Sequence, residues 1–360
     1  MQTERVADTE SCDIIFLLKM KRGVGAMLVP ILLFILGLVL LIKGGDWFVD
    51  GSTALARRLH TPEIVIGATV VAIGTTLPEV LVSATGALSG HGGIAYGNAI
   101  GSVICNTALI SALTFAIRPC DVDIKSFRTP VIFFFAAALI YTLTAYLGGD
   151  FTRLTGFILL AVFLLYIVFT IIAAQKHTTQ ENAADLIDNE PREINEVSTE
   201  ELPMWRIIFL LVTGAVCIAV GANLLVENGT KIAEGLGVPE SVIALTFVAL
   251  GTSLPELVTA ITALVKGHSA LSLGNIVGAN LFNLVLVSGL STVIAPFNIH
   301  ALDSNKVGNI PSSLAVEIPV MLFVMLFMTL PAINRGKLTR TQGIILLCVY
   351  AVFCVFQFVR

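Results

Sequence analysis

The chain has 360 residues, of which 56% are hydrophobic and only 13% are charged, and its formal net charge at pH 7 is −4. This composition lies outside the range of soluble proteins, so we expect a lipid bilayer around the chain and no nucleic-acid partner. Apolar stretches of membrane length recur along the sequence. None alternates between apolar and polar residues as a membrane β-barrel requires.

The N-terminal stretch, residues 1–26, fits this pattern least well. Its basic residues Arg5, Lys19, Lys21 and Arg22 would lie on the wrong side of the membrane by the positive-inside rule, and its apolar segment is too short to span a bilayer. It also lacks a small-residue cleavage site after a proper apolar core, so it is a poor signal peptide. We interpret it as an over-extended start before Met27, with a segment lying in the membrane interface as the alternative.

Ten apolar runs follow, and each is predicted to be a helix because backbone groups in lipid must bond internally. They cover residues 27–47, 63–88, 94–117, 129–147, 153–174, 205–227, 239–265, 269–293, 311–331 and 339–359. The polar linker 175–204 separates two sets of five, in residues 27–174 and 205–360. This acidic linker has no Asp-x-Asp-x-Asp-Gly calcium loop, so we interpret it as a solvated hinge.

Basic residues are concentrated in loops that fall on one side of this arrangement. The positive-inside rule makes that side cytoplasmic, with the central linker inside and both termini outside. We therefore expect a multi-pass protein of the cell (inner) membrane. The basic residues on the side predicted to be cytoplasmic are Lys43, Arg57, Arg58, Arg118, Lys125, Arg128, Lys176, Arg192, Arg206, Lys266, Arg335, Lys337 and Arg340.

The second run of each set carries nearly the same six residues. Residues 74–79 read Gly-Thr-Thr-Leu-Pro-Glu, and residues 251–256, which lie 177 positions later, read Gly-Thr-Ser-Leu-Pro-Glu. The offset holds without a gap over 48 residue pairs, of which 18 are identical. Shared apolar composition alone would give about a tenth. Since five is odd, the two halves must cross the membrane in opposite senses, which is typical of secondary transporters whose site lies between repeats.

Glu79 and Glu256 fall in the middle of these runs, where an ionised carboxylate is costly unless it is paired or hydrated. No Lys or Arg within the spans is placed to pair with them. Two facing carboxylates would need a cation or would take up protons, and one divalent cation balances their charge. The alternative is a pair of protonated glutamates that only hold helices together.

The residues before each glutamate are predicted to supply further oxygen ligands. Pro78 and Pro255 have no N–H, so the carbonyls of Gly74 and Gly251 lose their helical partners and the helix can open there. Carboxylate, carbonyl and hydroxyl oxygens together suit Ca²⁺ and Na⁺. The hydroxyls in these motifs belong to Thr75, Thr76, Thr252 and Ser253.

The next run of each half carries polar residues on one helical face. Asn98, Ser102 and Asn106 are four residues apart, and Asn275, Ala279 and Asn283 mirror them. Small residues in the same runs are expected to let neighbouring helices approach closely. These are Gly97, Gly101, Gly274 and Gly278. Packing alone would account for the glycines, but the asparagines need partners in lipid.

Several function classes are excluded or disfavoured by what the sequence lacks. It has no membrane-buried Ser/His pair, Asp dyad or His-Glu-x-x-His run, which disfavours an intramembrane hydrolase, and no phosphate-binding glycine loop for an ATP-driven pump. We therefore expect no enzyme, no cofactor and no obligate protein partner. A passive cation channel is the alternative from another class, but inverted repeats with broken helices favour alternating access.

These motifs resemble the sodium/calcium exchanger family of the calcium:cation antiporters. The paired repeats of that family read Gly-Thr-Ser-x-Pro-Glu, followed by Gly-Asn-x-x-Gly-Ser-Asn, and the resemblance covers nearly the whole chain from about residue 27. It implies an all-α membrane protein with ten transmembrane helices in two inverted five-helix repeats. It also implies a midplane site between helices two, three, seven and eight, and Ca²⁺ export driven by Na⁺ entry.

The resemblance also implies a role for each matching residue. Glu79 and Glu256 look like the central Ca²⁺ ligands, with backbone oxygens from Thr75 and Thr252. Flanking Na⁺ positions would be formed by the carbonyls of Ala72 and Ala249 and by Thr76, Ser253 and Ser102. Asn106 and Asn283 would line the centre.

The chain departs from the family pattern at three positions. Many exchangers have Asp where this chain has Asn283 and Ser where it has Ala279, and Val103 replaces the usual Asn. The site therefore has two carboxylates rather than three. Fewer charges favour fewer bound Na⁺ ions, or H⁺ as the counter-ion, so H⁺/Ca²⁺ exchange and K⁺-dependent Na⁺/Ca²⁺ exchange stay open as alternatives.

Overall fold

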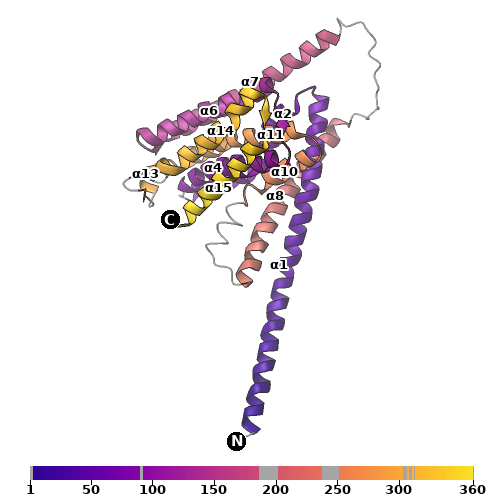
Figure 1. Cartoon of the computed structure of the whole chain (residues 1–360), viewed down its shortest axis with the longest axis vertical. Helices are drawn as coiled ribbons and strands as arrows, with labels where there is room; N and C mark the ends of the chain where they lie inside the picture. The colour runs from indigo at the N-terminus through magenta and orange to yellow at the C-terminus, as the bar shows by residue number, and fades with distance from the viewer. Residues whose placement is uncertain are drawn as a thin grey trace.

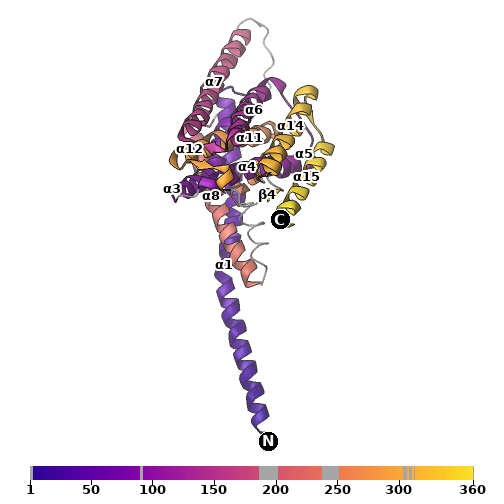
Figure 2. The same ribbon diagram turned by 90° about the vertical axis from the view of Figure 1, so that its left-hand side faces the viewer.

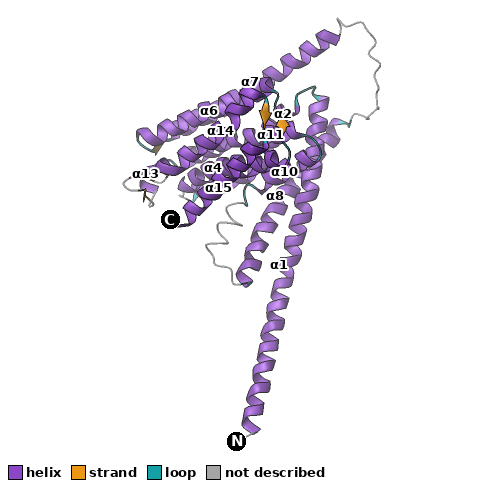
Figure 3. Ribbon diagram, viewed as in Figure 1, coloured by secondary structure: helices purple, strands orange, loops and turns teal. Residues whose placement is uncertain are grey.

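The computed structural model describes residues 3–89, 92–185, 202–236, 251–302, 306–307, 310–311 and 313–359. These residues are almost entirely helical (Figure 3). In this part of the chain, nine helices are long and apolar enough to cross a membrane, and Leu254–Val265 forms a shorter apolar helix. The protein is thus a multi-pass membrane protein.

The helices follow the chain in two series. In the first half they are α1 (Thr3–Arg58), α2 (Glu63–Ile66), α3 (Ala72–Leu88), α4 (Gly92–Cys105), α5 (Ala112–Ile117), α6 (Ile124–Leu147) and α7 (Arg153–Asp185). In the second half they are α8 (Met204–Gly235), α10 (Leu254–Val265), α11 (Ser269–Phe282), α12 (Ser288–Ile294), α13 (Ile299–Leu302), α14 (Ile318–Arg335) and α15 (Arg340–Val359). Among the described residues, four π-helices lie between or before them: η1 (Gly67–Val71), η2 (Asn106–Ser111), η4 (Asn283–Val287) and η5 (Ser313–Glu317).

Most of the predicted spans match these helices to within a few residues. Three helices are longer than predicted: α1 runs from Thr3 to Arg58, α7 continues to Asp185 and α8 continues to Gly235. Helix α7 therefore extends into the predicted linker 175–204. Near its C-terminal end α1 carries Asp46, inside the predicted span, and Asp50, beyond it; their charges are compensated by Lys266 at 3.3 and 2.8 Å. The seventh predicted span, 239–265, lies partly outside the described residues, and its C-terminal part forms α10.

The helices α1 and α8 run antiparallel along each other, and the N-terminal half of α1 projects away from the other helices (Figure 1). Glycines form their crossing. A Cβ on Gly37 would lie 2.8 Å from the carbonyl oxygen of Gly221, and one on Gly44 would lie 2.9 Å from that of Gly214. Gly214 and Gly221 are the residues 177 positions after Gly37 and Gly44. The contact is therefore symmetric between the two halves.

The last helix of each half packs on the other half. Helix α7 packs on α12, and α15 packs on α5. Gly156 of α7 lies against Gly289, and Gly343 of α15 lies against the corresponding Ala112. Figure 2 shows α7 and α15 on opposite sides of the helix bundle.

Short strands between the helices also pair across the two halves. The strands are β1 (Cys120–Asp121), β2 (Asp150–Phe151), β3 (Phe297–Asn298), β4 (Lys306–Val307), β5 (Ile310–Pro311) and β6 (Lys337–Leu338). Strand β1 of the first half pairs with β6 of the second, and β2 of the first half pairs with β3 of the second. Both pairs are antiparallel, and each half contributes one strand to each of them.

Candidate ion-binding site

The two Gly-Thr-x-Leu-Pro-Glu motifs meet in the interior of the bundle. Gly74, Thr75 and Pro78 of α3 line one narrow crevice together with Pro255 of α10, and α1 and α8 close its other side. Helices α3, α4, α10 and α11 and the π-helices η2 and η4 all pack around this point. The sequence-derived site therefore lies where the two halves touch.

Glu79 and Glu256 are fully buried in this region, with no exposed side-chain surface. The two carboxylates lie near enough for their negative charges to repel each other. In the described part of the chain, neither carboxylate accepts a hydrogen bond of ordinary geometry or forms a salt bridge. Two buried carboxylates that carry up to two negative charges thus lie near each other without a cationic partner among the described residues, which is the arrangement that a divalent cation balances.

Polar side chains around the glutamates show the same excess of unpaired oxygen atoms. The side-chain polar atoms of the following residues are buried and have no hydrogen-bond partner among the described residues: Thr76, Asn106, Ser253 and Asn283. Buried polar groups normally pair, so such a cluster needs a ligand or ordered water. The donors are hydroxyl and amide oxygens, which fit the hard cations Ca²⁺ and Na⁺.

Two asparagines that the sequence marked as needing partners hold the site's helices. The Thr75 hydroxyl donates to Oδ1 of Asn275 at 3.1 Å and also faces the Glu256 carboxylate. Asn98, the repeat counterpart of Asn275, donates through Nδ2 to Ser83 Oγ at 2.9 Å. Asn275 therefore fixes the Thr75 side chain between the two halves, a role that the sequence alone did not assign.

Both central asparagines begin a π-helix. Asn106 starts η2, and Asn283, 177 residues later, starts η4. A π-turn inserts one extra residue into a helix and is frequently found at functional sites. The thiol of Cys105, just before Asn106, lies beside Ser253 and Glu256. The start of η2 in the first half thus reaches the motif of the second half.

The predicted helix opening is found in one half and not in the other. In the second half, Gly251–Ser253 form a turn and α10 begins at Leu254, with Pro255 in its first turn. In the first half the prediction is wrong: α3 is α-helical from Ala72 through Gly74 and Pro78. Gly74 is held against the ring of Phe48, to which a Cβ would come within 2.7 Å. The irregular turn lies earlier instead, in η1.

The helix-packing glycines were predicted equally in both halves. A Cβ on Gly278 would lie 2.6 Å from the carbonyl oxygen of Ala68, and Gly274 is packed on the Ile64 carbonyl, so both need to be glycine. Gly97 and Gly101 have no described neighbour within 4 Å of such a Cβ. Their counterparts of Ile64 and Ala68 lie outside the described residues, so the first-half packing stays a prediction.

The other predicted site residues take varied positions. Ala72 and Ser102 are buried, and Thr252 is half-buried in the turn before α10. Ala249 lies outside the described residues. Within the described ranges, no group of three or more His, Cys, Asp or Glu side chains comes together. Any cation held here would therefore depend on two carboxylates supplemented by neutral oxygens.

A family model described as sodium/calcium exchanger protein matches residues 29–172 and 206–359. These two matched segments are the two halves of the chain. The chain belongs to the sodium/calcium exchanger family. It is therefore a membrane transporter of an antiporter family and not an enzyme.

Individual relatives of this exchanger-family protein match over nearly their whole length. The putative antiporter CaxA of Alkalimonas amylolytica is 34% identical over 330 residues, which are 90% of this chain and 97% of that protein. The sodium/calcium exchanger MaX1 of Methanosarcina acetivorans is 30% identical over 92% of this chain and 99% of its own. A solved structure of the sodium-calcium exchanger NCX_Mj, soaked with Na⁺ and Sr²⁺, matches with a TM-score of 0.72 and 32% identity. That match covers 91% of this chain and 98% of NCX_Mj.

Proposed function

We propose that this protein exports Ca²⁺ in exchange for Na⁺ by alternating access at the site between α3 and α10. The observation that carries the proposal is the meeting of Glu79 and Glu256, fully buried and without a described cationic partner. The names of MaX1 and NCX_Mj, which state sodium/calcium exchange, support the same ion pair.

The residues have distinct roles in this proposal. Glu79 and Glu256 bind Ca²⁺ and neutralise its charge, while backbone oxygens of Thr75 and Thr252 complete its shell. Asn106 and Asn283 act as neutral amide ligands at the centre. The flanking Na⁺ positions are formed by Thr76, Ser253, Ser102 and the carbonyls of Ala72 and Ala249.

Alternating access is proposed to rest on two five-helix repeats of opposite orientation, giving ten transmembrane helices. Three observations support it: the antiparallel crossing of α1 and α8, the exchange of α7 and α15, and the reciprocal pairing of β1–β6 and β2–β3. Each relates equivalent elements of the two halves, as a pseudo-two-fold axis in the membrane plane would.

The counter-ion follows from charge balance at the site. When Ca²⁺ leaves, the two facing carboxylates repel each other unless cations replace it. Because Asn283 adds no third charge, two monovalent ions are enough, and we propose that these are Na⁺. Protons at the same carboxylates, or K⁺ beside Na⁺, are the second candidates.

Flux into reconstituted vesicles tests this function. Radiolabelled Ca²⁺ uptake is measured with Na⁺, K⁺ or H⁺ gradients imposed separately. We expect uptake to require an opposing Na⁺ gradient and to stop when that gradient is collapsed. Uptake that persists without any counter-ion gradient would identify a channel, and uptake driven only by H⁺ would identify the proton-coupled alternative.

We also propose that the central linker is cytoplasmic and both termini are outside. Contacts join the basic loops: Arg58 donates to the Leu202 carbonyl at 3.0 Å, and Arg340 donates to the Ile117 carbonyl at 3.3 Å. The positive-inside rule assigns this end to the cytoplasm. A single cysteine introduced at Glu190 in a cysteine-free background should react only with membrane-permeant reagents in intact cells. Reaction with impermeant reagents would reverse the topology.

A further inference from the structure

A buried tyrosine outside the ion-site motifs touches the site helices of both halves. The hydroxyl of Tyr166 in α7 donates to the carbonyl oxygen of Ala68 at 2.9 Å, and its side chain is completely buried. Its ring packs edge-on against Phe282, with ring centroids 5.9 Å apart. Phe282 immediately precedes Asn283, and Ala68 lies four residues before Ala72.

Ala68 belongs to η1, the π-helix that leads into α3. The extra residue of a π-turn changes the angle at which the following residues leave the helix axis. Ala72 and Thr75, which follow directly, are in the ion site. Any change in η1 between π-helix and α-helix would rotate their oxygen atoms away from the position they now hold.

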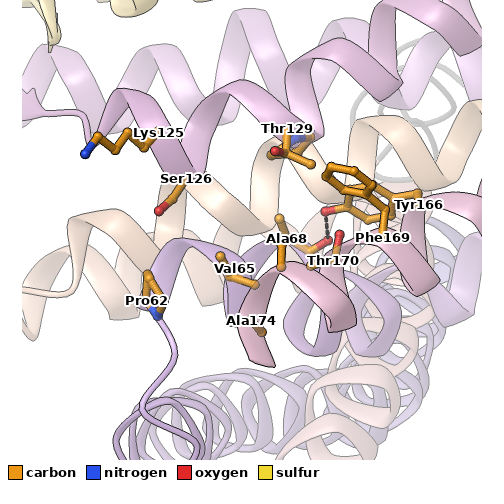
Figure 4. Close-up of a pocket in the computed structure, with 12 residues that line it drawn as sticks. Pro62, Val65, Ala68, Lys125, Ser126, Thr129, Tyr166, Phe169, Thr170 and Ala174 are labelled. Carbon is orange, nitrogen blue, oxygen red and sulfur yellow. Dashed lines mark hydrogen bonds between the residues drawn. The ribbon is translucent and has the colours of Figure 1, made fainter. Parts of the chain in front are cut away.

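The η1 segment is packed on one side and has space on the other. On one side Gly278 lies against the Ala68 backbone. On the other lies a cavity of about 240 Å³, lined by Ala68, Tyr166, Thr170 and residues of α2 and α6 (Figure 4). Figure 4 shows the hydrogen bond from the Tyr166 hydroxyl to the Ala68 carbonyl in η1, at the edge of this cavity. Packing alone therefore does not restrain η1 toward the cavity.

The second half has no hydroxyl at the corresponding position of α15. The residue of α15 that corresponds to Tyr166, with Arg153 aligned to Arg340 and Gly156 to Gly343, is Phe353. Phe353 packs against the core but has no hydroxyl. Repeat symmetry therefore does not account for the hydroxyl of Tyr166.

We propose that Tyr166 is a positioning residue for ion binding: its hydroxyl holds η1 as a π-helix and thereby sets the positions of Ala72 and Thr75. The inference rests on the proposed function of the site and adds a residue on a helix outside the motifs. It predicts that loss of one hydroxyl changes ion affinity from a distance, while the turnover rate changes less.

The test variant is Tyr166→Phe, which keeps the ring and its packing on Phe282. Because the Thr170 hydroxyl lies beside it and has no described partner, Thr170→Val is added in a second variant to prevent that hydroxyl from replacing the lost bond. Loss of a buried hydrogen bond should raise the Ca²⁺ KM about tenfold with kcat nearly unchanged. Tyr141→Phe is the matched control, because Tyr141 is equally buried and its hydroxyl donates to no carbonyl of η1.

Hydrogen–deuterium exchange of the purified protein gives a second readout that does not need transport. Peptides that cover 67–79 should exchange faster in Tyr166→Phe than in the unmodified protein or in Tyr141→Phe. Unchanged exchange would show that the hydroxyl does not restrain η1, and faster exchange with an unchanged KM would show a merely structural bond. If the unmodified protein shows no Na⁺-dependent Ca²⁺ flux, the proposed function fails, while the exchange comparison still tests the restraint on η1.

Discussion

The two halves of the ion site carry almost the same six residues in different local structures. In the first half, Gly74–Glu79 lies within the continuous helix α3, and the irregular turn is η1. In the second half, Gly251–Ser253 form a turn, and Glu256 lies in the first turn of the new helix α10. In the first half the ring of Phe48 packs against Gly74, where the helix is continuous.

The difference makes the two carboxylates unequal. Glu256 lies near a helix N-terminus, where unpaired N–H groups stabilise negative charge by roughly 0.3–1 kcal/mol. Glu79 lies within a helix and has no such benefit. A pair that is equivalent in sequence is therefore expected to hold charge unequally, and variants of corresponding residues are the way to measure this.

The largest effect is expected from Glu79→Gln and Glu256→Gln. Each variant leaves a single carboxylate for a divalent cation, and we expect Ca²⁺ flux to fall at least about a hundredfold while the protein still inserts and folds. Glu227→Gln, at an exposed carboxylate paired with Lys231, is the control and should transport normally. Flux near the unmodified level in either buried variant would remove the basis of the proposed site.

The next effect is expected from Asn283→Asp, compared with its counterpart Asn106→Asp. A third carboxylate needs further cations when Ca²⁺ leaves, so the Na⁺ and pH dependence of flux should shift by about tenfold while Ca²⁺ is still accepted. Measurement of flux against Na⁺ concentration and pH checks this. If Asn283→Asp shows the unmodified dependence on both, position 283 does not face the ions.

A smaller effect is expected at an ion pair that only one half has. Lys266 at the end of α10 binds Asp50 of α1 at 2.8 Å, whereas the corresponding residue of the first half is Ser89. Lys266→Ser should change the Ca²⁺ KM by up to about fivefold at low ionic strength and much less at high ionic strength, because such pairs are screened. Lys43→Ser, at a side chain 4.0 Å from Asp46, is the control and should have no effect. An equal effect of Lys266→Ser at both ionic strengths would rule out an electrostatic role.

The smallest effect is expected at Asp123, which lies between strand β1 and helix α6. Asp123 caps α6, and the hydrogen bond from the Ser126 hydroxyl, with the N–H groups of Lys125 and Ser126, lowers the pKa of its carboxyl. The corresponding residue is His300. Asp123→Ala should cost about 1 kcal/mol of stability at neutral pH, and His300→Ala less.

The pH dependence of this cap has a defined sign. A carboxyl whose pKa is lowered by folding stabilises the protein above its unfolded-state pKa, and this contribution is lost as pH falls through the folded-state value. The difference in Tm between the unmodified protein and Asp123→Ala should therefore shrink on acidification. A difference that is constant from neutral to acidic pH would show that the charge of Asp123 does not contribute.

The sequence predicts the parts of this molecule that depend on hydrophobic length and duplication. The helix positions and the two buried glutamates follow from apolar runs and the repeat offset. The π-turns at Asn106 and Asn283 do not, because the same apolar pattern fits an α-helix. The position of η1 and the contact from Tyr166 depend on neighbours distant in sequence, as does the hydrogen bond from Thr75 to Asn275.

The reciprocal strand pairs have a consequence for how the chain is made. Strand β1 is synthesised early, but its partner β6 lies far later in the chain, just before α15. The contact of Gly343 in α15 with Ala112 likewise joins a late segment of the chain to an early one. During synthesis, the strand edge of β1 and the face of α5 therefore stay open until β6 and α15 have been made, and the first half cannot complete its own packing alone.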